Sequence, residues 1–171
     1  MLVVEAPNPV HRTVSYVGAP SIFLAGSIEM GKAIDWQEEV TNLFEGRSCI
    51  ILNPRRGDWD STWEPVSTNE RFSQQVNWEL DHLEACDLIL MYLQPGTHSP
   101  ISLMELGLFA STGKMVVCCP EGFWRKGNVD IVAARHGVPV IPTYEEFLEH
   151  AAGWAEKFNP LWEPNGRLVA A

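Results

Sequence analysis

The feature that most constrains the fold of this chain is a set of short, almost purely apolar runs. They span residues 21–26, 49–52, 87–93, 114–119 and 138–141. A strand with one face in water alternates polar and apolar residues, whereas a continuous apolar run is typical of a strand covered on both faces. The runs therefore predict five parallel strands buried between layers of helices.

Segments with helical spacing separate these runs from one another. Between the first two runs, apolar residues recur every three to four positions across residues 32–44. Further helices are expected over residues 71–85, 99–111, 128–135 and 143–157. Ser99 and Thr143 are the expected N-caps of two of these helices, with Pro100 following Ser99 and Glu146 completing a capping box with Thr143.

The strict alternation of strands and helices favours a doubly wound α/β fold. Because crossovers between parallel strands are right-handed, we expect a single-domain, flavodoxin- or Rossmann-like sheet of five parallel strands flanked by helices. In the expected strand order 2-1-3-4-5, the first and third strands are neighbours, and their ends form the crevice where such sheets bind ligands. Gly26 and Ser27 after the first run, and residues 95–99 after the third, should flank that crevice.

The length of 171 residues fits one domain. Residues 1–19 hold Pro7 and Pro9 and show no regular pattern, and we expect them to form an N-terminal arm. The α/β domain is expected over residues 20–158. Residues 159–171, with two prolines, should form a non-helical C-terminal tail.

The charge balance excludes several classes of partner. The chain has 12 Lys and Arg against 22 Asp and Glu, a net charge of −10. That balance argues against binding to a nucleic acid polymer or to an anionic membrane, because both need a basic surface. No apolar run approaches the roughly 18–20 residues of a membrane-spanning helix, and no signal-peptide pattern begins the sequence. A cytoplasmic protein is expected.

The four cysteines do not suggest a metal site. Cys49, Cys86, Cys118 and Cys119 lie in or beside the apolar runs, and none forms a Cys-x-x-Cys pair. Cys118 and Cys119 are adjacent, so they should point to opposite faces of a strand. We expect all four to be small core side chains, and neither a metal nor an organic cofactor is predicted.

Glu105 interrupts the apolar pattern of the helix expected over residues 99–111. Ile101, Met104, Glu105 and Leu108 fall on one helical stripe, and a carboxylate there costs free energy unless it is paired or faces a cleft. Such an acid near the carboxyl end of a strand is a candidate nucleophile or general base. A structural cap or a place at an oligomer interface is the alternative.

The polar loop after the second run carries side chains suited to a nucleobase. In residues 53–60 and just beyond, Trp59 and Trp63 could stack on a planar ring, while Asp58 or Asp60 could accept hydrogen bonds from a base or sugar. A salt-bridged surface loop anchored by its tryptophans is the alternative interpretation.

A second loop, residues 26–31, joins the first run to the next helix and offers backbone amides to a phosphate or sugar oxygen. It contains neither Gly-x-Gly-x-x-Gly nor the Gly-Lys-Ser/Thr of a P-loop. A standard dinucleotide or NTPase site is therefore not expected.

Five segments share their order and spacing with one known family. They are Ile22–Ile28, Asn53–Arg56, Trp78–Leu80, Asp87–Ile89 and Ser99–Gly107. The most specific piece is Met-Glu-Leu-Gly at residues 104–107. Over roughly residues 20–145 the chain resembles the nucleoside 2-deoxyribosyltransferase superfamily, and within it the nucleoside 2-deoxyribosyltransferase-like domain.

The resemblance implies an enzyme that cleaves the N-glycosidic bond of 2′-deoxynucleosides. Glu105 matches the glutamate that attacks the anomeric carbon, and the resulting glycosyl ester passes the sugar to a second nucleobase. Glu79 matches an upstream carboxylate, usually Asp, that protonates the departing base or orients the nucleophile; by pattern alone it fits a solvated helix residue. Water as acceptor would make the protein an N-glycosidase of nucleosides or nucleotides. A non-catalytic nucleotide-binding module is the third alternative.

The resemblance also indicates how a substrate would be held. Ser99 stands where transferases carry a base-binding Asp, and it matches a phosphate-contacting Ser of related 2′-deoxynucleoside 5′-monophosphate N-glycosidases. Glu29 would repel a phosphate, which favours an unphosphorylated nucleoside. The expected substrate-binding residues are Gly26, Ser27, Asp58, Trp59, Asp60, Ser99 and Asn128. Because this family builds its sites at subunit contacts, the expected partners are a nucleoside or nucleotide, a nucleobase and further copies of the chain.

Overall fold

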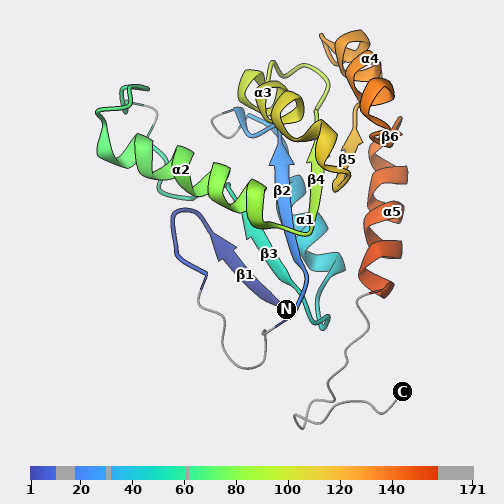
Figure 1. Cartoon of the computed structure of the whole chain (residues 1–171), viewed down its shortest axis with the longest axis horizontal. Helices are drawn as coiled ribbons and strands as arrows, with labels where there is room; N and C mark the ends of the chain where they lie inside the picture. Colours follow the sequence, from blue (N-terminus) through green and yellow to red (C-terminus); the bar gives the residue numbers. More distant parts are fainter. Residues whose placement is uncertain (11–17, 30–31, 61, 158–171) are drawn as a thin grey trace, which may run out of the picture.

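Within the described part of the chain, six parallel strands form one sheet (Figure 1). The structure is a computed structural model that describes residues 1–10, 18–29, 32–60 and 62–157. The strands are β1 Leu2–Glu5, β2 Ser21–Gly26, β3 Ile50–Asn53, β4 Leu88–Tyr92, β5 Met115–Cys118 and β6 Val140–Ile141. They pair in parallel in the order β1-β3-β2-β4-β5-β6.

The predicted order of the five apolar runs is confirmed, and the sheet has one further strand. Strand β1 lies in the segment expected to be an arm and pairs with β3 from Leu2 opposite Ile50 to Glu5 opposite Asn53. It is an edge strand of four residues in which only Val4 is buried. The apolar stretch that marks it in the sequence, residues 1–4, is short and is followed closely by Pro7 and Pro9. Residues 11–17 and 158–171 lie outside the described residues, so the predicted domain boundaries stay predictions.

Helices cover both faces of the sheet (Figure 1). Helices α1 Trp36–Leu43 and α5 Tyr144–Lys157 pack on one face. Helices α2 Glu70–Ala85, α3 Pro100–Phe109 and α4 Lys126–His136 pack on the other, and a 3₁₀ turn extends α3 to residue 112. All five expected helices are present, although α1 begins four residues later than its apolar spacing suggests. Among the described helices, none combines the length and apolar character needed to cross a bilayer.

The sheet separates two hydrophobic cores, one on each face, and alternate residues of each strand pack into one core or the other. In β2, Ile22 and Leu24 pack toward α1 and α5, whereas Phe23 and Ala25 pack toward α2, α3 and α4. The same alternation separates Cys118 and the residue after it, Cys119, which lie in opposite cores as predicted. All four cysteines are buried and reduced. In the described ranges, no group of three or more His, Cys, Asp or Glu is arranged to hold a metal ion.

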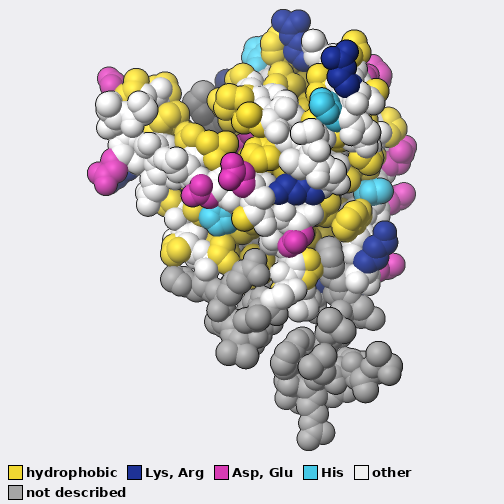
Figure 2. All heavy atoms as spheres, in the orientation of Figure 1, with side chains coloured by type: hydrophobic (Ala, Val, Ile, Leu, Met, Phe, Trp, Pro, Cys, Tyr) yellow, Lys and Arg dark blue, Asp and Glu magenta, His cyan; other side chains and the backbone are white. Residues whose placement is uncertain are grey.

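Helix α3 packs on the sheet with a different face from the one that its apolar stripe predicts. Ile101, Met104 and Leu108 are 55%, 51% and 55% exposed, whereas Glu105 is only 6% exposed. The buried face of α3 consists instead of Ser102, Glu105, Leu106 and Phe109. In Figure 2, apolar side chains gather over α3 on the surface of the molecule. The expected apolar stripe is therefore an exposed surface, and Glu105 belongs to the neighbouring, buried face.

The expected capping of the two helices is only half correct. Thr143 accepts a hydrogen bond from the backbone N–H of Glu146 at 3.2 Å, as predicted for the start of α5. Ser99 precedes α3 and Pro100 occupies its first turn, but the Ser99 side chain makes no capping hydrogen bond. Its backbone is left-handed, with φ of 43°, and its hydroxyl joins a buried cluster instead.

Candidate active site

The candidate active site lies where β2 and β4 end side by side. The connection after β2 leads to α1 on one face of the sheet, and the connection after β4 leads to α3 on the other. Such a topological switch opens a crevice beyond the strand ends. Gly26 closes β2 with φ of 131°, and a Cβ there would collide with the backbone of Tyr92. The Ser27 N–H then donates to the Tyr92 carbonyl at 2.8 Å. Glycine at position 26 is thus required for this close approach.

Three buried hydroxyl groups tie the two loops of the crevice together. The Ser27 hydroxyl lies 2.8 Å from that of Thr97 and 2.7 Å from that of Ser99. It also accepts from the backbone N–H of Gln94, while Thr97 donates to the Gln94 carbonyl. Because these bonds use the hydroxyls within the protein, they favour a scaffold role for Ser27 and Ser99. Their contact with substrate stays a prediction.

A carboxylate from the loop after β2 reaches the start of α3. Glu29 Oε1 accepts hydrogen bonds from the backbone N–H groups of His98 at 2.6 Å and Ser99 at 2.7 Å. The Ser99 bond contributes most to lowering the pKa of Glu29 below its usual value. Trp124 binds the same turn, since its indole N–H donates to the His98 carbonyl at 2.8 Å. The sequence indicated the charge of Glu29 but not this contact.

Glu105 combines deep burial with the absence of a hydrogen-bond partner. It lies on the buried face of α3, and no residue in the described part of the chain donates a hydrogen bond to its carboxylate. Burial, followed by the negative charge of Glu79, raises the pKa of Glu105 to about 8. A buried carboxylate with a strongly raised pKa is typical of catalytic acids, bases and nucleophiles. The structure therefore brings together the two acids that the sequence singled out.

Glu79 is held in place by a side chain that the sequence analysis missed. Gln75, one turn earlier on α2, donates from Nε2 to Glu79 Oε1 at 2.8 Å and to the Pro54 carbonyl at 3.0 Å. Burial raises the pKa of Glu79, and the Gln75 bond acts in the opposite direction. Arg56 extends the network, because its guanidinium donates to Gln75 Oε1 at 3.4 Å. The four-residue spacing of Gln75 and Glu79 was the available signal.

The loop after β3 has the internal contacts expected of a salt-bridged surface loop. Arg56 binds both carboxylate oxygens of Asp58, at 2.7 and 2.8 Å, and lies over the ring of Trp63. Trp59 packs edge-on against Trp63, with ring centroids 5.1 Å apart. Asp60 accepts two hydrogen bonds within its own turn. Substrate contacts by Asp58, Trp59 and Asp60 stay a prediction, although the loop connects to Glu79 through Arg56 and Gln75.

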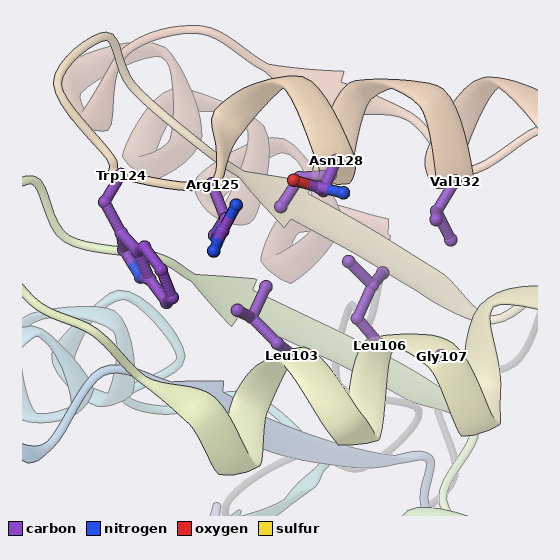
Figure 3. Close-up of a pocket in the computed structure, with 8 residues that line it drawn as sticks. Leu103, Leu106, Gly107, Trp124, Arg125, Asn128 and Val132 are labelled. Carbon is purple, nitrogen blue, oxygen red and sulfur yellow. The ribbon is translucent and has the colours of Figure 1, made fainter.

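Asn128 lies on α4, beside the pocket that this helix forms with α3. It lines a pocket of about 280 Å³ between α3 and α4, together with Leu103, Leu106 and Val132 (Figure 3). Within the described residues, no hydrogen bond joins Asn128 to Glu105 or to Glu79. Its expected contact with substrate stays a prediction.

Comparison with known proteins identifies the family and the fold of the chain. Residues 19–123 match a family model described as "Nucleoside 2-deoxyribosyltransferase like". A solved structure, a conserved protein from Enterococcus faecalis V583, superposes with a TM-score of 0.56 at 14% identity, covering 80% of this chain and 99% of that one. At this identity, the likeness shows the shared fold alone. No curated protein matches the chain significantly. Because the family match spans more than half of the 171 residues, the chain belongs to the nucleoside 2-deoxyribosyltransferase-like family.

Proposed function

We propose that the protein is an N-deoxyribosyltransferase that cleaves the N-glycosidic bond of 2′-deoxynucleosides, with Glu105 as nucleophile. The observation that carries this proposal is the Glu105 carboxylate, buried on α3 beside a second acid, Glu79. Keeping a carboxylate in such a place costs folding free energy, and chemistry at the site is the reason to retain it. Membership of the family supports the same substrate class.

The reaction proceeds in two displacement steps. A Glu105 carboxylate oxygen bonds to the anomeric carbon of the deoxyribose, and the electron pair of the broken C–N bond goes to the departing base. The base takes a proton from Glu79 as it leaves. In the second step, a ring nitrogen of another base attacks the anomeric carbon and its proton returns to Glu79. The ester oxygen leaves as the Glu105 carboxylate, which restores the enzyme.

The two acids suit this exchange because they share an electrostatic environment. The charge on Glu79 raises the pKa of Glu105, so ionising both at once is unfavourable and the pair tends to keep one proton. The raised pKa of Glu105 places this proton on Glu105 in the resting protein. The reactive state therefore requires the proton to move to Glu79, which leaves the charge on Glu105. Gln75 positions Glu79 through its 2.8 Å hydrogen bond.

We also propose that the protein works as a homo-oligomer. Ile101, Met104 and Leu108 present a largely apolar outer face of α3 to the surface. Contiguous exposed apolar side chains often mark sites of association. Since Glu105 lies on the buried face of the same helix, a contact between copies on α3 would adjoin the site.

A chromatographic assay tests the activity. The protein is incubated with each 2′-deoxynucleoside and its 5′-monophosphate, with and without a second free base. Glu105→Ala is the test variant, and Glu84→Ala, which removes an exposed acid from α2, is the matched control. We expect a new deoxynucleoside that requires both the added base and Glu105, with Glu84→Ala active.

Two other results would contradict the transferase. Release of free base and free sugar without exchange would show an N-glycosidase that uses the same nucleophile with water. Ligand binding without turnover across the panel would show a non-catalytic binding module.

A further inference from the structure

The start of α3 carries an anion that comes from the protein itself. Glu29 places one carboxylate oxygen on two successive backbone N–H groups, those of His98 and Ser99, at 2.6 and 2.7 Å. Beside them lie the hydroxyls of Ser27 and Thr97, which hold the turn in shape. Backbone N–H groups at a helix N-terminus favour a negatively charged ligand. Here an internal carboxylate already occupies these donors.

This contact is maintained against a local conformational cost. Glu29 has φ of 45° and Ser99 has φ of 43°, both in the left-handed region that side chains other than glycine rarely adopt. The His98 and Ser99 hydrogen bonds lower the pKa of Glu29, so the group remains a carboxylate at neutral pH. The negative charge at the two donors is therefore permanent under ordinary conditions.

The occupied donors lie within reach of a substrate bound at Glu105. Six residues separate Ser99 from Glu105 along α3, which corresponds to about 9 Å of helix rise. Side chains of a helix lean toward its N-terminus, so the Glu105 carboxylate is closer to the turn than its Cα. A deoxyribose whose anomeric carbon meets Glu105 would thus direct one end toward Glu29.

We propose that Glu29 determines specificity at this site: its carboxylate takes the place that a substrate phosphate would occupy, and so excludes 5′-phosphorylated substrates. The inference rests on the proposed function for the placement of the sugar. Two effects exclude the phosphate. The two N–H donors are already used, and the negative charge of Glu29 repels a second negative charge brought to the same place. An uncharged 5′-hydroxyl meets no such repulsion.

Two variants separate the contributions of charge and contact. Glu29→Gly removes the carboxylate, frees both N–H groups and suits the left-handed backbone. Glu29→Gln keeps the size of the side chain, removes its charge, and serves as the second variant where glycine weakens the fold. Glu45→Gly, at an exposed turn after α1, is the matched control for loss of one negative charge.

The first measurement uses inorganic phosphate and needs no turnover. The midpoint of thermal unfolding is recorded against phosphate concentration, with chloride at equal ionic strength as reference. We expect phosphate to stabilise Glu29→Gly, and Glu29→Gln more weakly, but neither the wild type nor Glu45→Gly. Equal phosphate binding by the wild type and Glu29→Gly would overturn the inference. Failure of both Glu29 variants to bind phosphate would overturn it too.

The second measurement compares each 2′-deoxynucleoside with its 5′-monophosphate. The wild type should favour the nucleoside in kcat/KM, and Glu29→Gly should reduce that preference at least about tenfold. An unchanged preference refutes the role of Glu29 in an active enzyme. If no variant turns over any substrate, the proposed function fails, and the phosphate titration still decides whether Glu29 excludes an anion.

Discussion

Replacing Glu105 by Gln should remove most of the loss of stability that this protein shows as pH rises from 4.5 to about 8. The substitution keeps the shape of a buried side chain and removes its ability to ionise. In the wild type, burial and the neighbouring charge of Glu79 raise the pKa of Glu105 from 4.5 to about 8. The unfolded chain exposes the carboxyl to water, where its pKa is close to the ordinary value.

The direction and the size of this pH effect follow from the linkage between proton binding and folding. Between pH 4.5 and about 8 the folded protein holds a proton at Glu105 that the unfolded chain has lost, so stability falls as pH rises through this window. One pKa unit corresponds to about 1.4 kcal/mol, which makes the full penalty on the order of 5 kcal/mol above pH 8. Well below pH 4.5 the acid is neutral in both states, so the wild type and Glu105→Gln should differ little in their pH dependence there.

Urea unfolding at a series of pH values from 5 to 9 measures this effect. The free energy of unfolding of Glu105→Gln, relative to wild type, should increase by several kcal/mol across the series. Glu84→Gln, which removes an exposed acid from α2, serves as the control. Its free energy of unfolding should change with pH in the same way as that of the wild type. If the free energies of unfolding of the wild type and Glu105→Gln change with pH in the same way instead, the pKa of Glu105 is not raised and the argument for a buried acid pair fails.

Three further substitutions test other parts of the structure. Gly26→Ala should lower the free energy of unfolding, measured in urea, by at least about 2 kcal/mol, because the new Cβ would meet the Tyr92 backbone and position 26 has a positive φ. Unchanged stability would contradict the close contact between the ends of β2 and β4. Gln75→Ala should lower kcat/KM and move the alkaline limb of its pH profile upward, since Glu79 loses a bond that favours its charged form; a profile that stays in place would leave Gln75 only structural. Met104→Glu should shift the sedimentation coefficient toward the monomer, and an unaltered coefficient would argue against association through α3.

Much of the fold was predictable because strands and helices leave local patterns. The continuous apolar run at residues 21–26 has its buried counterpart in β2, and the run at 87–93 contains β4. Their adjacency followed from the strand order expected of a doubly wound sheet, and it placed residues 26, 27 and 95–99 around one crevice. Strand β1 was missed because four residues at a sheet edge bury only one side chain.

At the candidate site, the sequence pointed to the two acids and to the loops around the crevice, but not to the contacts that these residues make. Glu105 stands out in an apolar helix, and Glu79 stands out by resemblance to a family. Periodicity showed that Glu105 shares a side of α3 with Met104, but the rotation of a helix on its sheet decides which neighbour is buried. That rotation depends on the packing of α3 against the sheet, which local spacing does not encode.

By itself, the sequence determined the elements, their order and the chemical character of the acid on α3, because these depend on residues close together in the chain. Tertiary structure alone decided the partners of Glu29 and Ser27, which lie about 70 positions further along the chain. Hydrogen bonds depend on distances of a few tenths of an ångström and on direction. Such precision arises only where the ends of β2 and β4 are packed side by side, so the occupied donors at the start of α3 could not be foreseen from spacing.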